Sequence, residues 1–278
     1  MVLWPHTQLC ALFWGIDVKK SIVKAKLAKN EPVLITQLHL TDGSLFEMAS
    51  LMGFDCLWMD LEHHSYSDET AANLMRASRV GTSDIVARPA KGEFMRMGRL
   101  LEAGATGILY PRCSDAEEAR EIVKWAKFAP QGKRGFDGSS GDNPYRFMGA
   151  GEYVETANKE TFIIAQLEEQ SAIDQAEEIC AVEGIDGLML GPADFSILSG
   201  IPGQVDHELV TAASETIAKA AANTGKHWGR TSSSFEKTQE YMDMGARLIF
   251  QGSDLMGLKG LLQKLKDDAA PLGFTFND

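Results

Sequence analysis

Short apolar runs alternate along the chain with longer segments of helical period. The apolar runs are continuous rather than alternating, and they lie at 33–38, 56–60, 84–88, 107–111, 161–168, 186–191, 226–230 and 247–252. Segments with apolar residues at helical spacing follow these runs near 44–52, 68–80, 92–103, 114–127, 171–181, 206–224, 234–244 and 253–268. Continuous apolar strands are typical of a parallel sheet that helices cover.

Eight strand–helix units predict a TIM (β/α)8 barrel, and 278 residues is an ordinary length for one. An open, doubly wound sheet is the alternative, but no G-x-G-x-x-G turn follows the first strand. A further helix is expected near 18–29. The predicted organisation is therefore an N-terminal extension with a helix over residues 1–30, followed by a single barrel domain over residues 31–278.

One stretch departs from the alternation. Residues 132–160 (GKRGFDGSSGDNPYRFMGAGEYVETANKE) are polar and glycine-rich, with little apolar periodicity. A connection of this length inside a compact domain is usually functional or interfacial. We expect its part over 136–148 to help form the walls of a substrate pocket.

Composition narrows the function. The 27 basic and 39 acidic residues give a formal net charge of −12, which argues against nucleic acid and an anionic membrane surface as partners. The four cysteines, at positions 10, 56, 113 and 180, form no C-x-x-C pair, so free buried thiols are expected. The apolar start lacks a basic region and no long apolar run exists. A cytoplasmic protein without a signal peptide or membrane span is therefore the expectation.

Candidate chemistry gathers where the predicted strands end, which is where TIM barrels carry their active sites. The residues at these ends are Asp60, Glu62, His63, His64, Arg88, Gln166, Glu168 and Asp194. Glu168 and Asp194 are one strand–helix repeat apart, so their carboxylates can meet on a hard divalent cation. The same spacing also suits a glutamate at a strand end and an aspartate that caps a short helix.

Three further groups suit an anionic substrate. The turn before Asp194 opens a helix, so the amides of Gly191 and Ala193 can receive a carboxylate. Arg88 can clamp a carboxylate or stabilise an oxyanion, although a salt bridge is an equally open interpretation. His63 can act as a base near neutral pH, and a structural histidine is the alternative.

With these residues at its strand ends, the chain resembles the HpcH/HpaI aldolases, metal-dependent class II pyruvate aldolases with a TIM-barrel fold. The resemblance covers roughly residues 31–265. The matching stretches are GFDCLWMDLEH (53–63), VARP (86–89), LLEAGATGILYPRCSDAEEA (100–119), GKRG (132–135), AQLEE (165–169) and VEGIDGLMLGPADFS (182–196).

The resemblance implies reversible aldol cleavage of a 4-hydroxy-2-oxo acid to pyruvate and an aldehyde. Glu168 and Asp194 resemble the ligands of a divalent metal (Mg²⁺, Mn²⁺ or Co²⁺), and Arg88 resembles the arginine beside the keto oxygen. His63 resembles the base for the aldol proton, with Asp60 in its hydrogen-bonded network.

Four other positions follow from the same resemblance. Gln166 matches a polar residue near the metal, and the amides of Gly191 and Ala193 resemble the cradle for the pyruvate carboxylate. Glu102 stands where the family commonly has the aspartate that pairs with the catalytic histidine, so the chain departs from the family there.

Several alternatives remain open. The same site can decarboxylate oxaloacetate, or use the enolate to form another carbon–carbon bond as macrophomate synthase does; a non-catalytic ligand-binding barrel is a third interpretation. The lack of an evident basic patch disfavours the CoA-ester lyases of the wider superfamily. The family also implies a homo-oligomer, often a hexamer that exchanges its last helix, whereas the sequence LMGLKGLLQKL by itself is typical of plain packing against the barrel.

Overall fold

The computed structural model describes residues 17–232 and 234–277. Residues 1–16, 233 and 278 lie outside the described residues. The predicted extension before residue 17 and Cys10 therefore also lie outside them.

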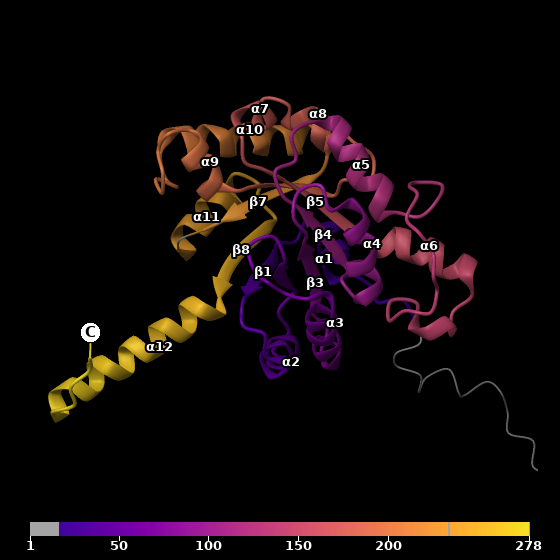
Figure 1. The fold of residues 1–278 in the computed structure, drawn as a ribbon. Coiled ribbons are helices and arrows are strands. Elements are labelled where there is room, and N and C mark those ends of the chain that lie inside the picture. Colours follow the sequence, from indigo (N-terminus) through magenta and orange to yellow (C-terminus); the bar gives the residue numbers. More distant parts are fainter. Residues whose placement is uncertain (1–16, 233, 278) are drawn as a thin grey trace, which may run out of the picture.

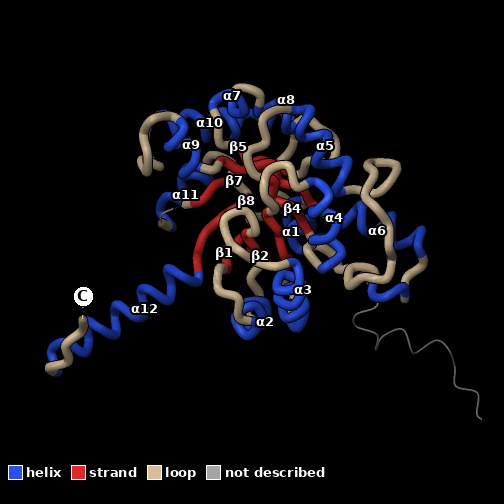
Figure 2. Tube along the Cα trace, in the orientation of Figure 1, coloured by secondary structure: helices blue, strands red, loops and turns tan. Residues whose placement is uncertain are grey.

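Eight parallel strands form a closed barrel in sequence order, and helices surround it (Figures 1 and 2). The strands are β1 (Val33–Leu38), β2 (Cys56–Asp60), β3 (Asp84–Arg88), β4 (Gly107–Tyr110), β5 (Phe162–Leu167), β6 (Gly187–Leu190), β7 (His227–Thr231) and β8 (Leu248–Ser253). The predicted TIM-barrel fold is confirmed, and each predicted strand overlaps the observed one. The continuous apolar runs predict the strands because β2 to β6 are buried along their whole length.

The helices differ from the predicted ones mainly between β4 and β6. They are α1 (Ile22–Leu27), α2 (Gly43–Leu51), α3 (Asp68–Ala77), α4 (Phe94–Ala103), α5 (Ala116–Ala126), α6 (Ala150–Glu160), α7 (Gln170–Ile173), α8 (Ala176–Cys180), α9 (Pro192–Leu198), α10 (Glu208–Thr224), α11 (Phe235–Asp243) and α12 (Asp254–Ala269). The single helix expected over 171–181 is two short ones, α7 and α8. The stretch expected to be irregular contains α6.

The barrel interior is filled by side chains from the strands, and α1 covers its N-terminal end. Val23 and Leu27 of α1 belong to the same buried cluster as the inward-facing residues of the strands. The buried Asp84 at the start of β3 accepts hydrogen bonds from Ser21 Oγ (2.7 Å) and from the amide of Val23 (2.9 Å). The helix is thereby fixed to the barrel end opposite the carboxyl ends of the strands.

The 132–160 stretch folds around a buried ion pair. Arg134, whose side chain is 2% exposed, lies 2.6 Å from Asp142, and Tyr153 of α6 donates to the same carboxylate at 2.5 Å. The residues near 141–144 line a cavity together with Thr82, Thr106 and Thr161, which precede β3, β4 and β5. Within one chain this loop therefore lies toward the N-terminal end of the barrel, contrary to the expectation that it helps form the pocket walls.

The terminal helix α12 leaves the barrel and projects from it (Figure 1). It contains no buried residue, and Leu261, Leu262 and Leu265 are each more than half exposed. Plain packing against the barrel, which the sequence of this helix favours by itself, is therefore wrong within one chain.

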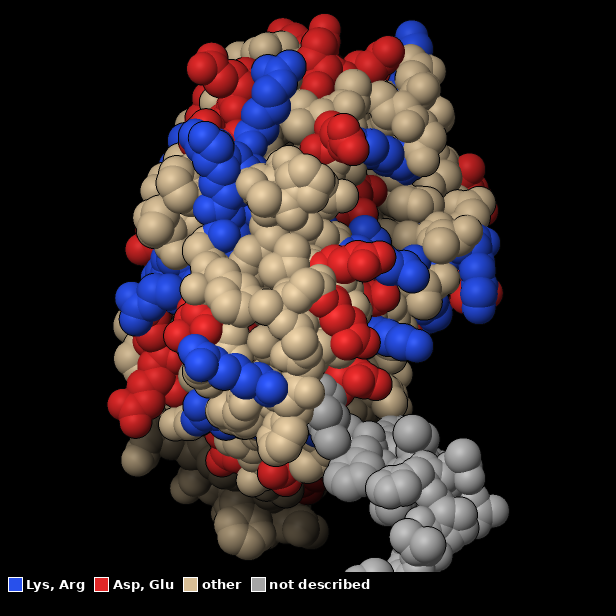
Figure 3. Space-filling model, turned by 90° about the vertical axis from the view of Figure 1, so that its right-hand side faces the viewer, with Lys and Arg blue, Asp and Glu red and all other residues tan. Residues whose placement is uncertain are grey.

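Other expectations concern thiols, membranes and charge. Cys56, Cys113 and Cys180 are buried and free, as expected. No helix within the described residues has the length and apolar character needed to cross a bilayer. On the face shown in Figure 3, basic and acidic side chains are interspersed rather than gathered into one basic surface.

Candidate active site

The site begins with a two-point ion pair between the last residues of β2 and β3. Asp60 and Arg88 lie side by side in the strand register. Arg88 donates from Nε to Asp60 Oδ1 (2.9 Å) and from Nη2 to Asp60 Oδ2 (2.6 Å), and the guanidinium lies 4.7 Å from the centre of the Trp58 ring. Burial opposes the charged form of Asp60, but the hydrogen bonds and charge of Arg88 outweigh it and lower the pKa of this carboxyl. Arg88 is therefore held rigidly at the barrel mouth.

A hydrogen-bonded chain continues from Arg88 across the mouth to β5. Arg88 Nη1 donates to Gln166 Oε1 (3.3 Å), and Gln166 Nε2 donates to Glu168 Oε1 (2.8 Å). Gln166 thereby has its amide orientation fixed, since its oxygen faces a donor and its nitrogen faces an acceptor. These hydrogen bonds connect the predicted residues at the ends of three strands, β2, β3 and β5.

Glu168 and Asp194 are brought together, and both contact Arg112. The amide of Arg112 donates to Glu168 Oε2 (3.0 Å), and Arg112 Nη2 lies 3.4 Å from Asp194 Oδ1. Burial and the nearby charge of Asp194 raise the pKa of Glu168 to about 7. Arg112 was not singled out from the sequence, although it follows the fourth strand and the same strand-end argument applies to it.

These groups fit a divalent cation. Two carboxylates, one of them almost wholly buried, offer oxygen atoms of the kind that Mg²⁺ and Mn²⁺ prefer. A bound cation would relieve the repulsion between the two negative charges. Within the described residues no cluster of three or more His, Cys, Asp or Glu side chains is arranged for a metal, so a cation here would keep positions for an oxo acid and water.

Gly191 has a different role from the predicted one. Its amide donates to the carbonyl of Leu167 (3.0 Å), so the barrel ladder uses it and it cannot receive a substrate carboxylate. A Cβ at this position would collide with Glu168 Oε1. Gly191 therefore makes room for the Glu168 carboxylate, while the amides of Ala193 and Asp194, in the first turn of α9, are the ones available to an anion.

His63 lies at the mouth with its side chain half exposed. Its Nε2 is 3.6 Å from Glu62 Oε2, and its backbone amide donates to Asp60 Oδ1 (3.3 Å). Glu62 also lies 3.4 Å from Arg88 Nε. Burial raises the pKa of Glu62 despite the charge of Arg88. Glu62, which the sequence left without a role, is thus the carboxylate that contacts the His63 side chain within the chain.

Glu102 is not brought to His63 within one chain. It lies in the last turn of α4, just before β4 begins, and therefore toward the opposite end of the barrel from the mouth. Burial raises the pKa of its carboxyl, and the charge of Arg134 opposes this shift. No hydrogen bond or ion pair joins the described side chains of Glu102 and His63. The expected pairing is absent because helices of a β/α barrel run antiparallel to the strands.

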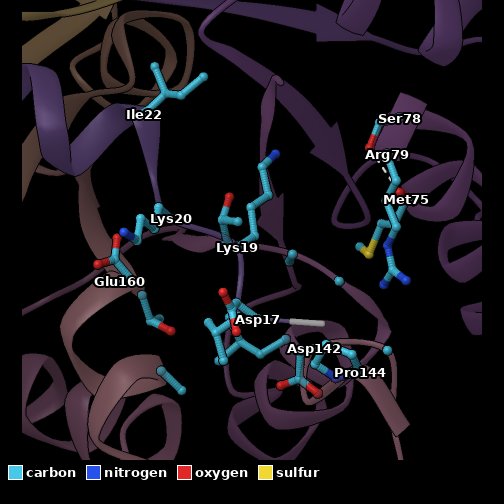
Figure 4. Close-up of a pocket in the computed structure, with 18 of the residues that line it drawn as sticks. Asp17, Lys19, Lys20, Ile22, Met75, Ser78, Arg79, Asp142, Pro144 and Glu160 are labelled. Atoms are coloured by element: carbon cyan, nitrogen blue, oxygen red, sulfur yellow. Dashed lines mark hydrogen bonds between the residues drawn. The ribbon is translucent and has the colours of Figure 1, made fainter. Parts of the chain in front are cut away.

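A separate cavity of about 430 Å³ lies away from these residues (Figure 4). It is lined by Lys19, Lys20, Arg79 and Asp142 among others, from α1, α3 and the 132–160 stretch and their flanking segments. Because this cavity is at the N-terminal end of the barrel, it is not the site formed by the strand ends.

A closed parallel barrel with its polar groups gathered at the carboxyl ends of the strands has the architecture of TIM-barrel enzymes. A family model described as HpcH/HpaI aldolase/citrate lyase matches residues 37–259. The chain belongs to this family of metal-dependent aldolases and is a carbon–carbon lyase.

Individual relatives agree with this assignment. The chain is 30% identical to the hydroxypyruvate/pyruvate aldolase of Cupriavidus necator, over 87% of this chain and 90% of the relative. It is 30% identical to the 2-keto-3-deoxy-L-rhamnonate aldolase of Escherichia coli K12, over 84% of this chain and 87% of the relative. The crystal structure of an HpcH/HpaI aldolase from Desulfitobacterium hafniense superposes with a TM-score of 0.85 at 29% identity, covering 91% of this chain and 98% of that one.

Proposed function

We propose that the protein catalyses reversible, metal-dependent aldol cleavage of a 4-hydroxy-2-oxo acid to pyruvate and an aldehyde. The observation that carries the proposal is the hydrogen-bonded chain Asp60–Arg88–Gln166–Glu168, which joins a fixed guanidinium to a carboxylate pair. A substrate with adjacent keto and carboxylate oxygens matches this arrangement of one arginine, two carboxylates and the α9 amides.

Glu168 and Asp194 would hold the metal, which is Mg²⁺, Mn²⁺ or Co²⁺. The bound cation would polarise the 2-oxo acid and stabilise enolate charge as a Lewis acid. Arg88 uses three of its five N–H groups on Asp60 and Gln166, so two remain for the keto oxygen. Because the guanidinium is already oriented, it needs no rearrangement as negative charge develops on that oxygen.

His63 takes the proton from the C4 hydroxyl. The C3–C4 bond then breaks, its electron pair forms the C2–C3 double bond of the enolate, and the aldehyde leaves. Protonation of the enolate at C3 gives pyruvate. The half-exposed His63 ring can reach a substrate at the mouth, and Glu62 lies beside its Nε2, while Asp60 accepts the backbone amide of His63. Glu102 would assist His63 only if it came from another copy of the chain.

Product analysis tests this proposal against its alternative. A 4-hydroxy-2-oxo acid should be cleaved to pyruvate in the presence of Mn²⁺, and EDTA should abolish the activity. Oxaloacetate is supplied in parallel. The contrary result is that the enzyme releases CO₂ from oxaloacetate yet cleaves none of a series of 4-hydroxy-2-oxo acids of different chain length. That result would mean that the site belongs to a decarboxylase and not to an aldolase.

We also propose that the chain forms a homo-oligomer, a hexamer in keeping with the family, in which α12 packs against a neighbouring copy. The support is the run of exposed leucines on α12, which a monomer would leave in water. Leu261→Asp with Leu265→Asp should shift the mass measured by light scattering toward a smaller species. Lys264→Gln on the same helix is the control and should leave the mass unchanged. An unchanged mass for the leucine variant would contradict the proposal.

A further inference from the structure

Two histidines that the proposed mechanism does not use lie together at the mouth. His39 follows β1, and His64 lies four residues after Asp60 at the end of β2. Their rings are 4.7 Å apart between centroids and nearly perpendicular, at 78°. The side chains are 13% and 33% exposed, so both are partly open to the mouth rather than sealed in the core.

His39 is held in one orientation by Asp254, the first residue of α12. Asp254 accepts the backbone amides of His39 (2.9 Å) and Leu40 (2.8 Å), and its Oδ1 lies 2.8 Å from His39 Nδ1. Since a carboxylate only accepts, Nδ1 carries the proton. His39 Nε2 has no hydrogen-bond partner among the described residues, so it is available to a ligand.

The pair lies across the barrel from the candidate metal ligands. β1 and β5 are four strands apart in either direction around the closed barrel. A 2-oxo acid held near Glu168 and Asp194, with its keto oxygen at Arg88, directs C4 toward His63 on the β2 side. C4 becomes the aldehyde carbon, and the carbons beyond it would then extend toward His39 and His64.

The charges around the pair select for an uncharged group. Both charged groups that contact the two rings are carboxylates: Asp254 lies beside His39, and Asp60, which is paired with Arg88, lies beside His64. Burial lowers the pKa of His64, which favours its neutral ring. A carboxylate on the aldehyde would meet like charges here. A hydroxyl both donates and accepts, so it can pair with a ring nitrogen of either histidine whether or not that nitrogen carries a proton.

We propose that His39 and His64 form a recognition site for hydroxyl groups of the aldehyde portion, so that the enzyme selects uncharged hydroxyaldehydes over carboxylated or unsubstituted ones. This inference rests on the proposed aldolase function and specifies its substrate class.

The test compares aldehydes in condensation with pyruvate and Mn²⁺. Wild type should have a higher kcat/KM with glyceraldehyde than with propionaldehyde or succinic semialdehyde. The ratio of glyceraldehyde to propionaldehyde should fall about tenfold in His64→Ala, the value of one hydrogen bond. His39→Asn should lower it similarly, while its amide can still donate to Asp254. Ser65→Ala, an exposed change on the same loop, is the control and should keep the wild-type ratio.

The outcomes separate the two proposals. If pyruvate methyl protons exchange with D₂O in a metal-dependent manner but both histidine variants keep the wild-type ratio, the recognition site is wrong and the aldolase stands. A wild-type preference for succinic semialdehyde would also overturn the recognition site. If no metal-dependent exchange occurs in wild type, the proposed function itself fails.

Discussion

Replacing Glu168 by glutamine removes the charge of a candidate metal ligand while keeping its shape. The pKa of this carboxyl is raised to about 7 by burial and by Asp194, from an ordinary value of 4.5. The native state therefore binds this proton more tightly than the unfolded state does. The contribution of the protonated carboxyl is complete below about pH 4.5 and is lost as the pH rises to about 7.

The size of the effect follows from that difference. At about 1.4 kcal/mol per pH unit, ionising Glu168 in the metal-free protein costs roughly 3 kcal/mol of stability. Glutamine also loses one acceptor for Gln166 or Arg112, which costs about 1 kcal/mol at every pH. The informative quantity is thus the change in stability with pH and not the stability at one pH.

Thermal unfolding measures it. In EDTA, wild type should lose several degrees of Tm relative to Glu168→Gln between pH 5 and pH 8. Mn²⁺ should restore the Tm of wild type at pH 8 but not that of the variant. Glu169→Gln, an exposed neighbour, serves as the control and should behave as wild type. Parallel pH profiles for wild type and Glu168→Gln would mean that burial and Asp194 do not raise the pKa of Glu168.

Three further changes test the remaining groups. Arg88→Lys keeps the charge but not the two-point contact with Asp60. In steady-state kinetics, kcat/KM for cleavage should therefore fall at least about a hundredfold, while metal titration should show an unchanged Mn²⁺ affinity. Gly191→Ala should lower Mn²⁺ affinity about ten- to a hundredfold by calorimetry, because a Cβ would displace Glu168; equal affinity would contradict this. His63→Ala should lose a factor of about 10² to 10⁴ in cleavage yet bind Mn²⁺ normally, and loss of the metal instead would overturn its assigned role.

The barrel and much of its mouth could be predicted from sequence because the topology converts chain order into geometry. A strand such as β5 is buried along its whole length and therefore reads as an unbroken apolar run. Once eight such runs are known, the residue at each strand end must lie at one mouth. Arg88, Gln166 and Glu168 were found in this way, and Arg112 was available to the same argument.

Other features depend on contacts that a local pattern does not contain. Tyr153 and Ala157 of α6 are buried against Val18 and Phe128, which come from distant segments, so the 132–160 stretch looked irregular. The hydrogen bond from the Gly191 amide to the carbonyl of Leu167 depends on the register of neighbouring strands. The apolar face of α12 predicts burial, but its sequence does not specify the surface that covers it.

Exchange of pyruvate methyl protons with D₂O, followed by NMR in the absence of any aldehyde, tests enolate formation at this site most directly. We expect exchange that requires Mg²⁺, Mn²⁺ or Co²⁺, that EDTA abolishes, and that Glu168→Gln loses. Exchange that persists without metal, together with a pyruvate adduct on a lysine trapped by borohydride, would contradict this expectation.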